Sequence, residues 1–273
     1  MFPDRVQFDE SPNEAGAGIQ RLAARFAGHA YDLHRHETYS IGLTVQGTQC
    51  FRYRGIDRAS QAGQVLVLHP DEAHDGHAGT ESGFTYRMIY VDPALIGATP
   101  FVPDVVAHDP VLRDIVEEAF TDFPSPLEPL AQDSLLARLA DGLANRSDGR
   151  PSPRRKPLAG RGVALARDFL IAEAHRAIGS EELERVSGLD RFTLARQFRS
   201  AFGTSPHRFQ IGRRLARARS LIGRGMALVD AAASAGFADQ SHLTRHFATR
   251  FGLTPGRWAT LNRADSDPHR RAS

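Results

Sequence analysis

The sequence predicts a multidomain protein in which a β-rich N-terminal half is followed by an all-α C-terminal half. Three observations support this fold class. Residues 25–91 form short alternating segments broken by turn residues, whereas apolar residues recur at helical spacing from residue 109 onward. A phrase near the C-terminus occurs twice, 49 residues apart. The two halves also carry net charges of opposite sign.

The N-terminal half is expected to form a β-barrel or a sandwich. Its apolar segments are short and closely spaced, which is typical of these folds. Gly47, Gly55 and Gly63 lie at the predicted turns between the segments. The predicted strands cover residues 39–45, 50–53, 64–68 and 84–91.

Two helices are expected after the strands. Apolar residues recur at intervals of three and four in residues 111–119 and again in residues 127–143. Residues 123–126 contain two prolines and separate the two runs. The leucines of these helices are suited to packing on the β-domain or on a second subunit, and the pattern leaves both open.

The charge of the chain changes sign near residue 145. Residues 1–145 contain 10 arginines and 21 acidic residues, a net charge of −11, and residues 146–273 contain 24 basic and 11 acidic residues, a net charge of +13. A basic domain favours a polyanionic partner, because cations placed near phosphates release condensed counterions. Charge alone does not separate DNA from RNA or anionic lipid. Residues 146–157 hold three prolines and five basic residues, which predicts an extended linker between two domains.

The remaining composition favours a soluble cytoplasmic protein. Cys50 is the only cysteine in the sequence, so no disulfide forms within the chain. The sequence begins without the apolar region of a signal peptide, and it has no apolar run near the roughly 20 residues needed to span a bilayer. We therefore expect no membrane association.

The repeated phrase indicates a duplicated structural unit. In each copy a short helix, a glycine-containing turn and a second helix follow at the spacing of a helix-turn-helix. Asp190 and Asp239 are expected to cap the second helices, because their carboxylates can accept hydrogen bonds from first-turn amides. Eight positions are identical in the two copies: Asp190/Asp239, Leu194/Leu243, Arg196/Arg245, Phe198/Phe247, Phe202/Phe251, Gly203/Gly252, Pro206/Pro255 and Arg208/Arg257.

The C-terminal half is expected to contain seven helices. In the second helix of each repeat, leucine and phenylalanine recur at i, i+4 and i+8 and form a buried stripe. The outward residues include arginine and glutamine, which can read base edges in a major groove. The predicted helices cover residues 161–177, 181–187, 191–202, 206–223, 228–235, 240–251 and a short segment that starts near residue 256.

Residues from about 158 to 262 strongly resemble the AraC/XylS group of bacterial transcription regulators. The phrases at residues 236–247 and 252–255 carry the resemblance. In that family one long helix, which corresponds to residues 206–223 here, joins two helix-turn-helix units. The resemblance implies that both second helices enter successive major grooves of double-stranded DNA. The candidate DNA-binding residues are Arg191, Phe192, Ala195, Arg196, Arg199, Gln240, Ser241, His242, Thr244 and Arg245.

One position departs from the pattern of that family. Its members usually have a small alanine in the helix that precedes each recognition helix. Ala232 fits this pattern, whereas the corresponding residue of the first repeat is Glu184. The first unit is therefore expected to pack somewhat differently.

Three histidines of the N-terminal half form a second candidate site. His34 and His36 precede one strand and His74 follows another, so a barrel is expected to bring them together. Imidazole nitrogens in this arrangement are suited to a divalent metal. The pattern resembles the cupin barrels with which AraC-type regulators sense small molecules. Cupin enzymes usually add a glutamate four residues after the second histidine, where this chain has Ser40. A metal site, a metal-free effector pocket and a structural role stay open.

Together these features predict a multidomain, β then all-α transcription regulator that binds specific DNA sequences and responds to a small-molecule effector. The expected parts are a cupin-like sensor at 1–145, the linker at 146–157, the double helix-turn-helix domain at 158–262 and a disordered tail at 263–273. A homodimer is expected, with RNA polymerase as a further candidate partner and no catalytic residues. The alternatives are a metal-dependent cupin enzyme fused to a DNA-binding module and a constitutive DNA-binding protein with a vestigial barrel.

Overall fold

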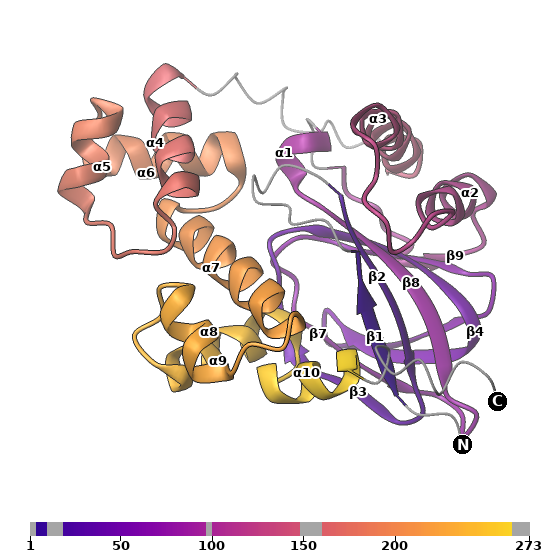
Figure 1. Cartoon of the computed structure of the whole chain (residues 1–273). Coiled ribbons are helices and arrows are strands. Elements are labelled where there is room, and N and C mark those ends of the chain that lie inside the picture. The colour runs from indigo at the N-terminus through magenta and orange to yellow at the C-terminus, as the bar shows by residue number, and fades with distance from the viewer. Residues whose placement is uncertain (1–3, 10–18, 97–99, 148–159, 264–273) are drawn as a thin grey trace.

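A β-domain and a helical domain lie side by side in the computed structural model, which describes residues 4–9, 19–96, 100–147 and 160–263 (Figure 1). The predicted linker and tail fall almost entirely outside these residues and are not tested. The strands are β1 (Arg5–Phe8), β2 (Gln20–Phe26), β3 (His29–His34), β4 (Tyr39–Tyr53), β5 (Ile56–Gln61), β6 (Val65–Leu68), β7 (His74–Ala78), β8 (Phe84–Val91) and β9 (Val106–Ala107).

The long strand β4 holds the β-domain together. Its first half pairs with β8 and β6, and its second half pairs with β5 and β7, always antiparallel. The predicted turn at Gly47 is wrong, because the two segments on either side of it belong to this one strand. Gly47 has a φ of +75°, and a Cβ there would lie 2.0 Å from the carbonyl oxygen of Gly83. Glycine therefore permits a bend inside a continuous strand and a close approach to its neighbour.

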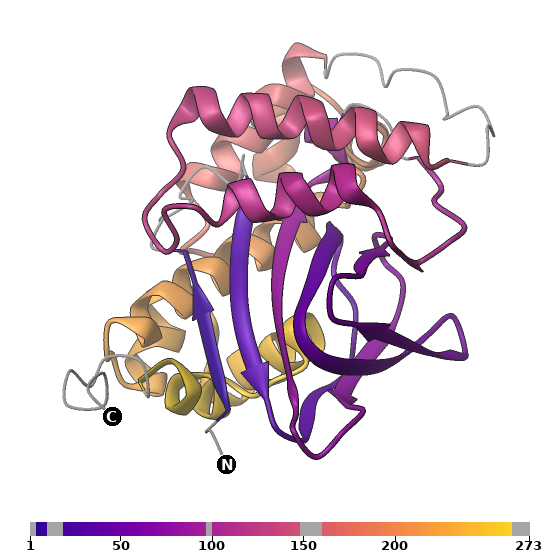
Figure 2. The same cartoon turned by 90° about the vertical axis from the view of Figure 1, so that its right-hand side faces the viewer.

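Helices α2 (Pro110–Ala119) and α3 (Pro129–Asn145) cover one face of the β-domain, as Figure 2 shows. Most of their apolar residues are buried in one cluster with Ile41 and Val67 of the strands, whereas Val111 and Leu130 are exposed. The buried leucines therefore pack on the β-domain, which is one of the two alternatives that the sequence left open. The short helix α1 (Pro93–Ile96) lies beside them and was not predicted.

The helical domain contains the seven predicted helices within residues 160–263. The first helix ends at Ala172 instead of residue 177, because Arg214 donates to the carbonyl oxygens of Ala174 (2.7 Å) and Arg176 (2.6 Å) and so stabilises a turn there. The helices are α4 (Arg161–Ala172), α5 (Ser180–Ser187), α6 (Arg191–Phe202), α7 (Pro206–Gly223), α8 (Leu228–Ser234), α9 (Gln240–Phe251) and α10 (Pro255–Arg263).

Both recognition helices begin at the predicted aspartates. Asp190 accepts from the backbone amides of Phe192 and Thr193, each at 3.0 Å, and Asp239 accepts from that of His242 at 2.7 Å. Such caps satisfy first-turn amides that have no partner inside the helix. The duplicated aspartate therefore fixes where each recognition helix starts.

The two repeats differ in their packing. The first unit has its own cluster, in which Leu183, Leu194 and Phe198 pack on α4. The second unit shares one cluster with the β-domain, and the rings of Phe8 and Trp258 meet across the junction at 6.3 Å. The second helix-turn-helix is therefore packed against the sensor.

Leu139 of α3 tests the packing of the helices on the β-domain. We expect Leu139→Ala to lower the free energy of unfolding by about 2–5 kcal/mol, because its side chain is fully buried. The matched control is Leu130→Ala on the same helix, where the side chain is 82% exposed and the expected change is within about 0.5 kcal/mol. Urea denaturation of both variants provides the measurement. Equal effects would contradict the observed packing.

Candidate DNA interface and effector site

The predicted DNA-reading residues of α6 all lie on its exposed face. Arg191, Phe192, Ala195, Arg196 and Arg199 are solvent-exposed. The side chain of Phe192 is 79% exposed, which is unusual for so large an apolar group. An aromatic ring at the start of a recognition helix is suited to contact with the methyl group of thymine.

On the corresponding face of α9, some of the predicted DNA-reading residues make contacts within the protein. Gln240, Ser241 and Arg245 are exposed, whereas His242 and Thr244 are half-buried. The ring of His242 lies 5.4 Å from that of Phe237 and accepts, at Nδ1, from the backbone amide of Ala238 at 3.4 Å. Its distance from that amide makes this a weak bond.

Glu184 explains the departure of the first unit from the family pattern. Its carboxylate accepts from the backbone amide of Arg191 at 2.7 Å and from the Arg191 side chain at 3.1 Å. Ala232, at the corresponding position of the second unit, is completely buried. The first unit therefore joins its two helices by a charged contact where the second uses close packing, as the sequence predicts.

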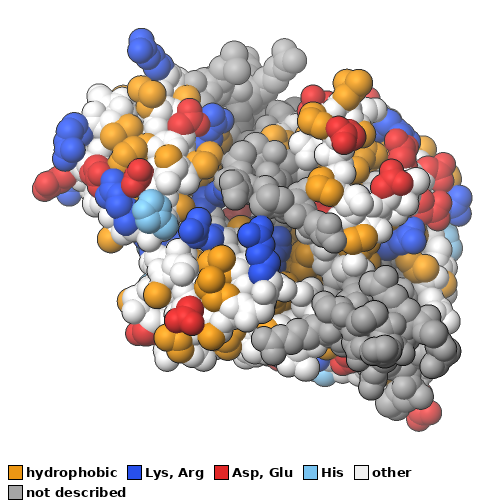
Figure 3. Space-filling view, in the orientation of Figure 1, with side chains coloured by type: hydrophobic (Ala, Val, Ile, Leu, Met, Phe, Trp, Pro, Cys, Tyr) orange, Lys and Arg blue, Asp and Glu red, His pale blue; other side chains and the backbone are white. Residues whose placement is uncertain are grey.

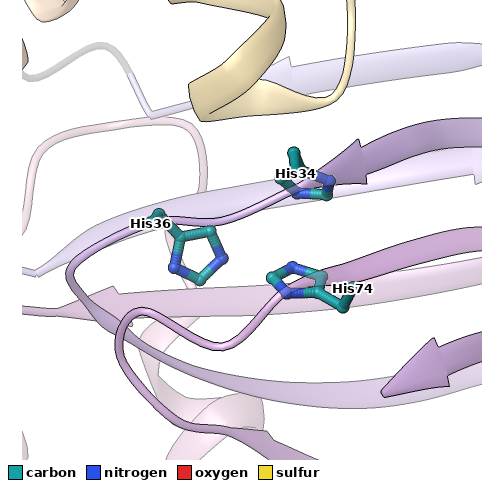
Figure 4. Close-up of side chains that lie close together, drawn as sticks. All are labelled: His34, His36 and His74. Carbon is teal, nitrogen blue, oxygen red and sulfur yellow. The ribbon is translucent and has the colours of Figure 1, made fainter. Parts of the chain in front are cut away.

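The three predicted histidines come together where β3 and β7 meet the loop before β4 (Figure 4). One ring nitrogen from each of His34, His36 and His74 lies within 4.8 Å of the other two. All three residues are buried. The geometric prediction is confirmed, and the cluster faces the helical domain instead of a closed barrel interior.

Backbone carbonyl groups orient all three rings. Nδ1 of His34 lies 2.8 Å from the carbonyl oxygen of Asp32, that of His36 3.1 Å from Thr38, and that of His74 3.0 Å from Glu72. An Nδ1–H that donates to a carbonyl leaves Nε2 as the basic nitrogen.

The environment keeps the histidines neutral. Burial, helped by the neighbouring His74, lowers the pKa of His34 to about 3 and that of His36 well below its ordinary value. Burial also lowers the pKa of His74. Neutral imidazoles with an oriented Nε2 are the form that binds transition metals.

Ser40 occupies the position at which cupin enzymes carry a glutamate. Its hydroxyl lies 3.1 Å from Nε2 of His36. Nearby His69 belongs to another environment, where it bonds to the hydroxyl of Tyr53 and the amide of Val102. His77 is exposed. The cluster among the described residues is thus three imidazoles with a hydroxyl and no carboxylate ligand.

A pocket opens beside this cluster between the two domains. The pocket is narrow and partly open: the space between its lining atoms amounts to about 470 Å³, and this figure includes open solvent. The β-domain contributes mostly apolar walls together with His34 and His36, and the helical domain contributes residues of α7, α9, α10 and the loop after α9. The lining includes Phe8, Leu22, Tyr31, Tyr90, Phe251, Leu253 and Trp258.

Three residues of the helical domain that line this pocket carry polar groups: Arg219, Arg250 and Trp258. Arg219 lies over the ring of Phe8 at 4.0 Å, and burial lowers its pKa to about 10 against the attraction of Asp9. Arg250 forms an ion pair with Glu37. The indole N–H of Trp258 is buried and has no hydrogen-bond partner among the described residues. A buried donor of this kind is destabilising unless a ligand or water accepts from it.

The end of α9 is docked on β3 and the loop that follows it. The amide of Asp32 donates to the carbonyl oxygen of Gly252 at 3.0 Å, and that of Arg35 to Thr249 at 3.3 Å. A Cβ on Gly252 would lie 2.6 Å from Nδ1 of His34. Glycine is therefore required for this contact as well as for the positive φ of +65° at the end of the helix.

The sequence analysis missed the contribution of the helical domain to this pocket. Arg219, Arg250 and Trp258 come from helices whose periodicity was interpreted as core and DNA-facing surface. The sequence repeat drew attention to Phe251 and Gly252, which are identical to their counterparts in the first unit. Their additional contact with the sensor could be seen only in the structure.

Acidification should destabilise the metal-free protein. His34 and His36 stay neutral in the fold and regain a pKa of about 6.5 on unfolding, so the unfolded state binds more protons as the pH falls below that value. Going from pH 7.5 to 5.5, each such histidine should lower the free energy of unfolding by about 1 kcal/mol. Urea denaturation in the presence of EDTA measures this loss. His74→Gln should reduce this pH dependence, whereas His77→Gln should leave it unchanged. A wild-type stability that does not vary with pH would contradict the assignment of the loss to the buried histidines.

Comparison with known proteins identifies a family for each of the two domains. Residues 16–155 match the family described as AraC-like ligand binding domain, and residues 183–260 match a helix-turn-helix domain. An uncharacterized HTH-type transcriptional regulator of Bacillus subtilis, YbfI, is 23% identical over 81% of this chain and 85% of its own length. Such relatives are transcription regulators and not enzymes, so the enzyme alternative is set aside.

Solved structures of ToxT from Vibrio cholerae have the same fold. One at 1.65 Å resolution has a TM-score of 0.62 and 10% identity and covers 89% of this chain and 98% of its own. Another, described as unsaturated fatty acid bound wild-type ToxT, has a TM-score of 0.57 and 12% identity and covers 96% of this chain and 98% of its own. The two-domain fold and the ligand-binding match, which spans just over half of the sequence, show that this chain belongs to the AraC family of transcription regulators.

Proposed function

We propose that an effector bound between the two domains controls how this regulator uses its second helix-turn-helix. The observation that carries the proposal is the pocket at the junction, which both domains line. A ligand there contacts the sensor and the DNA-binding domain at once. It therefore shifts the equilibrium between domain arrangements by its differential affinity for them.

The effector is proposed to be an organic anion with an apolar body. Arg219 is a half-buried cation, and Trp258 is a buried donor without an acceptor among the described residues, while the surrounding walls are mostly apolar. A carboxylate satisfies both polar groups, and charge-assisted hydrogen bonds of this kind are strong. The ToxT structures named above include one with an unsaturated fatty acid, which belongs to this chemical class.

The histidine cluster is proposed to hold a divalent transition metal. Three oriented, neutral imidazoles fit zinc, copper or nickel better than magnesium or calcium, which prefer oxygen ligands. The carbonyl partners of the three Nδ1 atoms correspond to the outer contacts that hold metal-binding histidines in place. When bound, the metal would supply a structural anchor at the domain junction.

The two recognition helices are proposed to read different base pairs. The exposed residues differ between the units, with Phe192 and Ala195 in the first and Ser241 and Thr244 in the second, so the site on DNA should be asymmetric. Helix α7 contains 18 residues, and a helix of that length spans about 27 Å. This connection is long enough to set the units in neighbouring turns of the major groove.

The proposal also includes a homodimer, contact with RNA polymerase and a cytoplasmic location. Val111 of α2 and Leu130 of α3 are large apolar side chains exposed to solvent, and contact with a second subunit would remove them from water. Acidic side chains are concentrated over α2 and α3, whereas basic ones follow the helical domain (Figure 3). Among the described helices, none combines the length and hydrophobicity that a bilayer-spanning segment requires.

Alanine substitution of the two shared arginines tests the DNA interface. Arg196→Ala and Arg245→Ala are each expected to weaken binding to the preferred site by about 1–3 kcal/mol, because each arginine is proposed to bind a guanine edge. The preferred site is first selected from random duplexes, and affinities are then measured at fixed salt. Binding to unrelated DNA should change little. An equal loss on both DNAs would assign that arginine to the phosphate backbone.

Arg219→Met tests the effector site. The substitution keeps an unbranched apolar stem and removes the cation, so binding of an unsaturated fatty acid such as oleate should fall at least about tenfold, as measured by calorimetry. Arg217→Met on the exposed face of α7 is the matched control and should bind as the wild type does. Oleyl alcohol, which lacks the carboxylate, distinguishes charge recognition from partition into an apolar groove. Equal binding of acid and alcohol by the wild type would refute the anion site.

A further inference from the structure

We propose that metal bound by His34, His36 and His74 locks the end of α9 onto the sensor, so that metal occupancy regulates the freedom of the second helix-turn-helix. This inference rests on the proposed metal site and adds a regulatory role to it. Its basis is a segment of the sensor, residues 32–37, that contacts the histidine cluster and α9 at the same time.

The side chains and the backbone of this segment have different partners. His34 and His36 direct their rings to the cluster. The amides of Asp32 and Arg35 donate to carbonyl oxygens at the end of α9, and Glu37 forms an ion pair with Arg250. Each of these three docking residues is therefore within two residues of a proposed metal ligand.

The contact with Gly252 makes this coupling tight. The position that a Cβ on Gly252 would occupy is only 2.6 Å from Nδ1 of His34 and 2.9 Å from the carbonyl oxygen of Asp32. The same Nδ1 bonds to that carbonyl at 2.8 Å. A rotation of the His34 ring or a shift of its backbone thus moves atoms that touch α9.

Docking also prepares the metal site. The end of α9 covers His34, which is 9% exposed, and holds the strand that carries it. Because docked α9 restricts His34, the docked arrangement should bind metal more tightly than an undocked one. Linkage then requires that metal stabilise docking by the same factor.

The consequence for DNA binding follows from the asymmetry of the repeats. The first unit has a separate hydrophobic cluster, whereas the second shares one with the sensor. Fixing α9 fixes the second recognition helix relative to the sensor directly, whereas it reaches the first unit only through α7. Metal should therefore change binding to DNA that engages both units more than binding to DNA that engages the first alone.

Hydrogen exchange at two backbone amides tests the lock. The amides of Asp32 and Arg35 are the donors to α9, so their exchange rates report docking directly. We expect Zn²⁺ at saturation to slow exchange at both amides of the full-length protein by about tenfold, a coupling of ordinary size. In His74→Gln, which removes a ligand that does not belong to the docking segment, Zn²⁺ should have no such effect.

The matched control is His77→Gln, an exposed histidine on the same strand β7, which should respond to Zn²⁺ as the wild type does. Without metal, His74→Gln should exchange at the same rates as the wild type, which verifies that the variant keeps its fold. Calorimetric titration with Zn²⁺ runs in parallel. If Zn²⁺ binds at one equivalent but exchange at Asp32 and Arg35 is unchanged, the lock is wrong and the metal site stands. If no stoichiometric binding occurs, both proposals fail.

Discussion

The close approach of α9 to β3 is the constraint on which the arrangement of the two domains depends. Gly252 ends the recognition helix in the left-handed region and lies where a side chain would collide with His34. One glycine thus serves helix termination and domain contact. The same contact places Arg250 and Phe251 at the wall of the pocket, so the pocket is complete only while α9 is docked.

Apolar packing and backbone hydrogen bonds, more than charge, hold this contact. The sensor is acidic and the helical domain is basic, yet the ion pairs between them, such as Arg208 with Asp71 at 3.2 Å, are partly exposed. Exposed ion pairs contribute little to stability and weaken with salt. The ring contact between Phe8 and Trp258 and the two backbone hydrogen bonds to α9 are better protected from solvent. Charge is therefore better suited to orienting the domains than to binding them together.

The helical domain could be predicted almost residue by residue, because its signals are local. Aspartate caps, glycine ends and the leucine–phenylalanine stripe lie within each helix. The β-domain was predicted less completely, since short edge strands such as β1 depend on distant partners and Gly47 bends a strand where glycine usually marks a turn. The histidine cluster was predictable from spacing across two strands. Arg219 and Trp258 were not, because no periodicity indicates which helix face meets another domain.

The helix-turn-helix unit is duplicated, but only the second copy packs against the sensor. A sensor can therefore act on one of two units that have the same fold. Both units keep the same capping aspartate and buried phenylalanine, so their folds are alike. Only the second supplies the glycine and tryptophan that meet the sensor, whereas the first is packed on α4 around Phe198. A signal at the junction therefore reaches one recognition helix first.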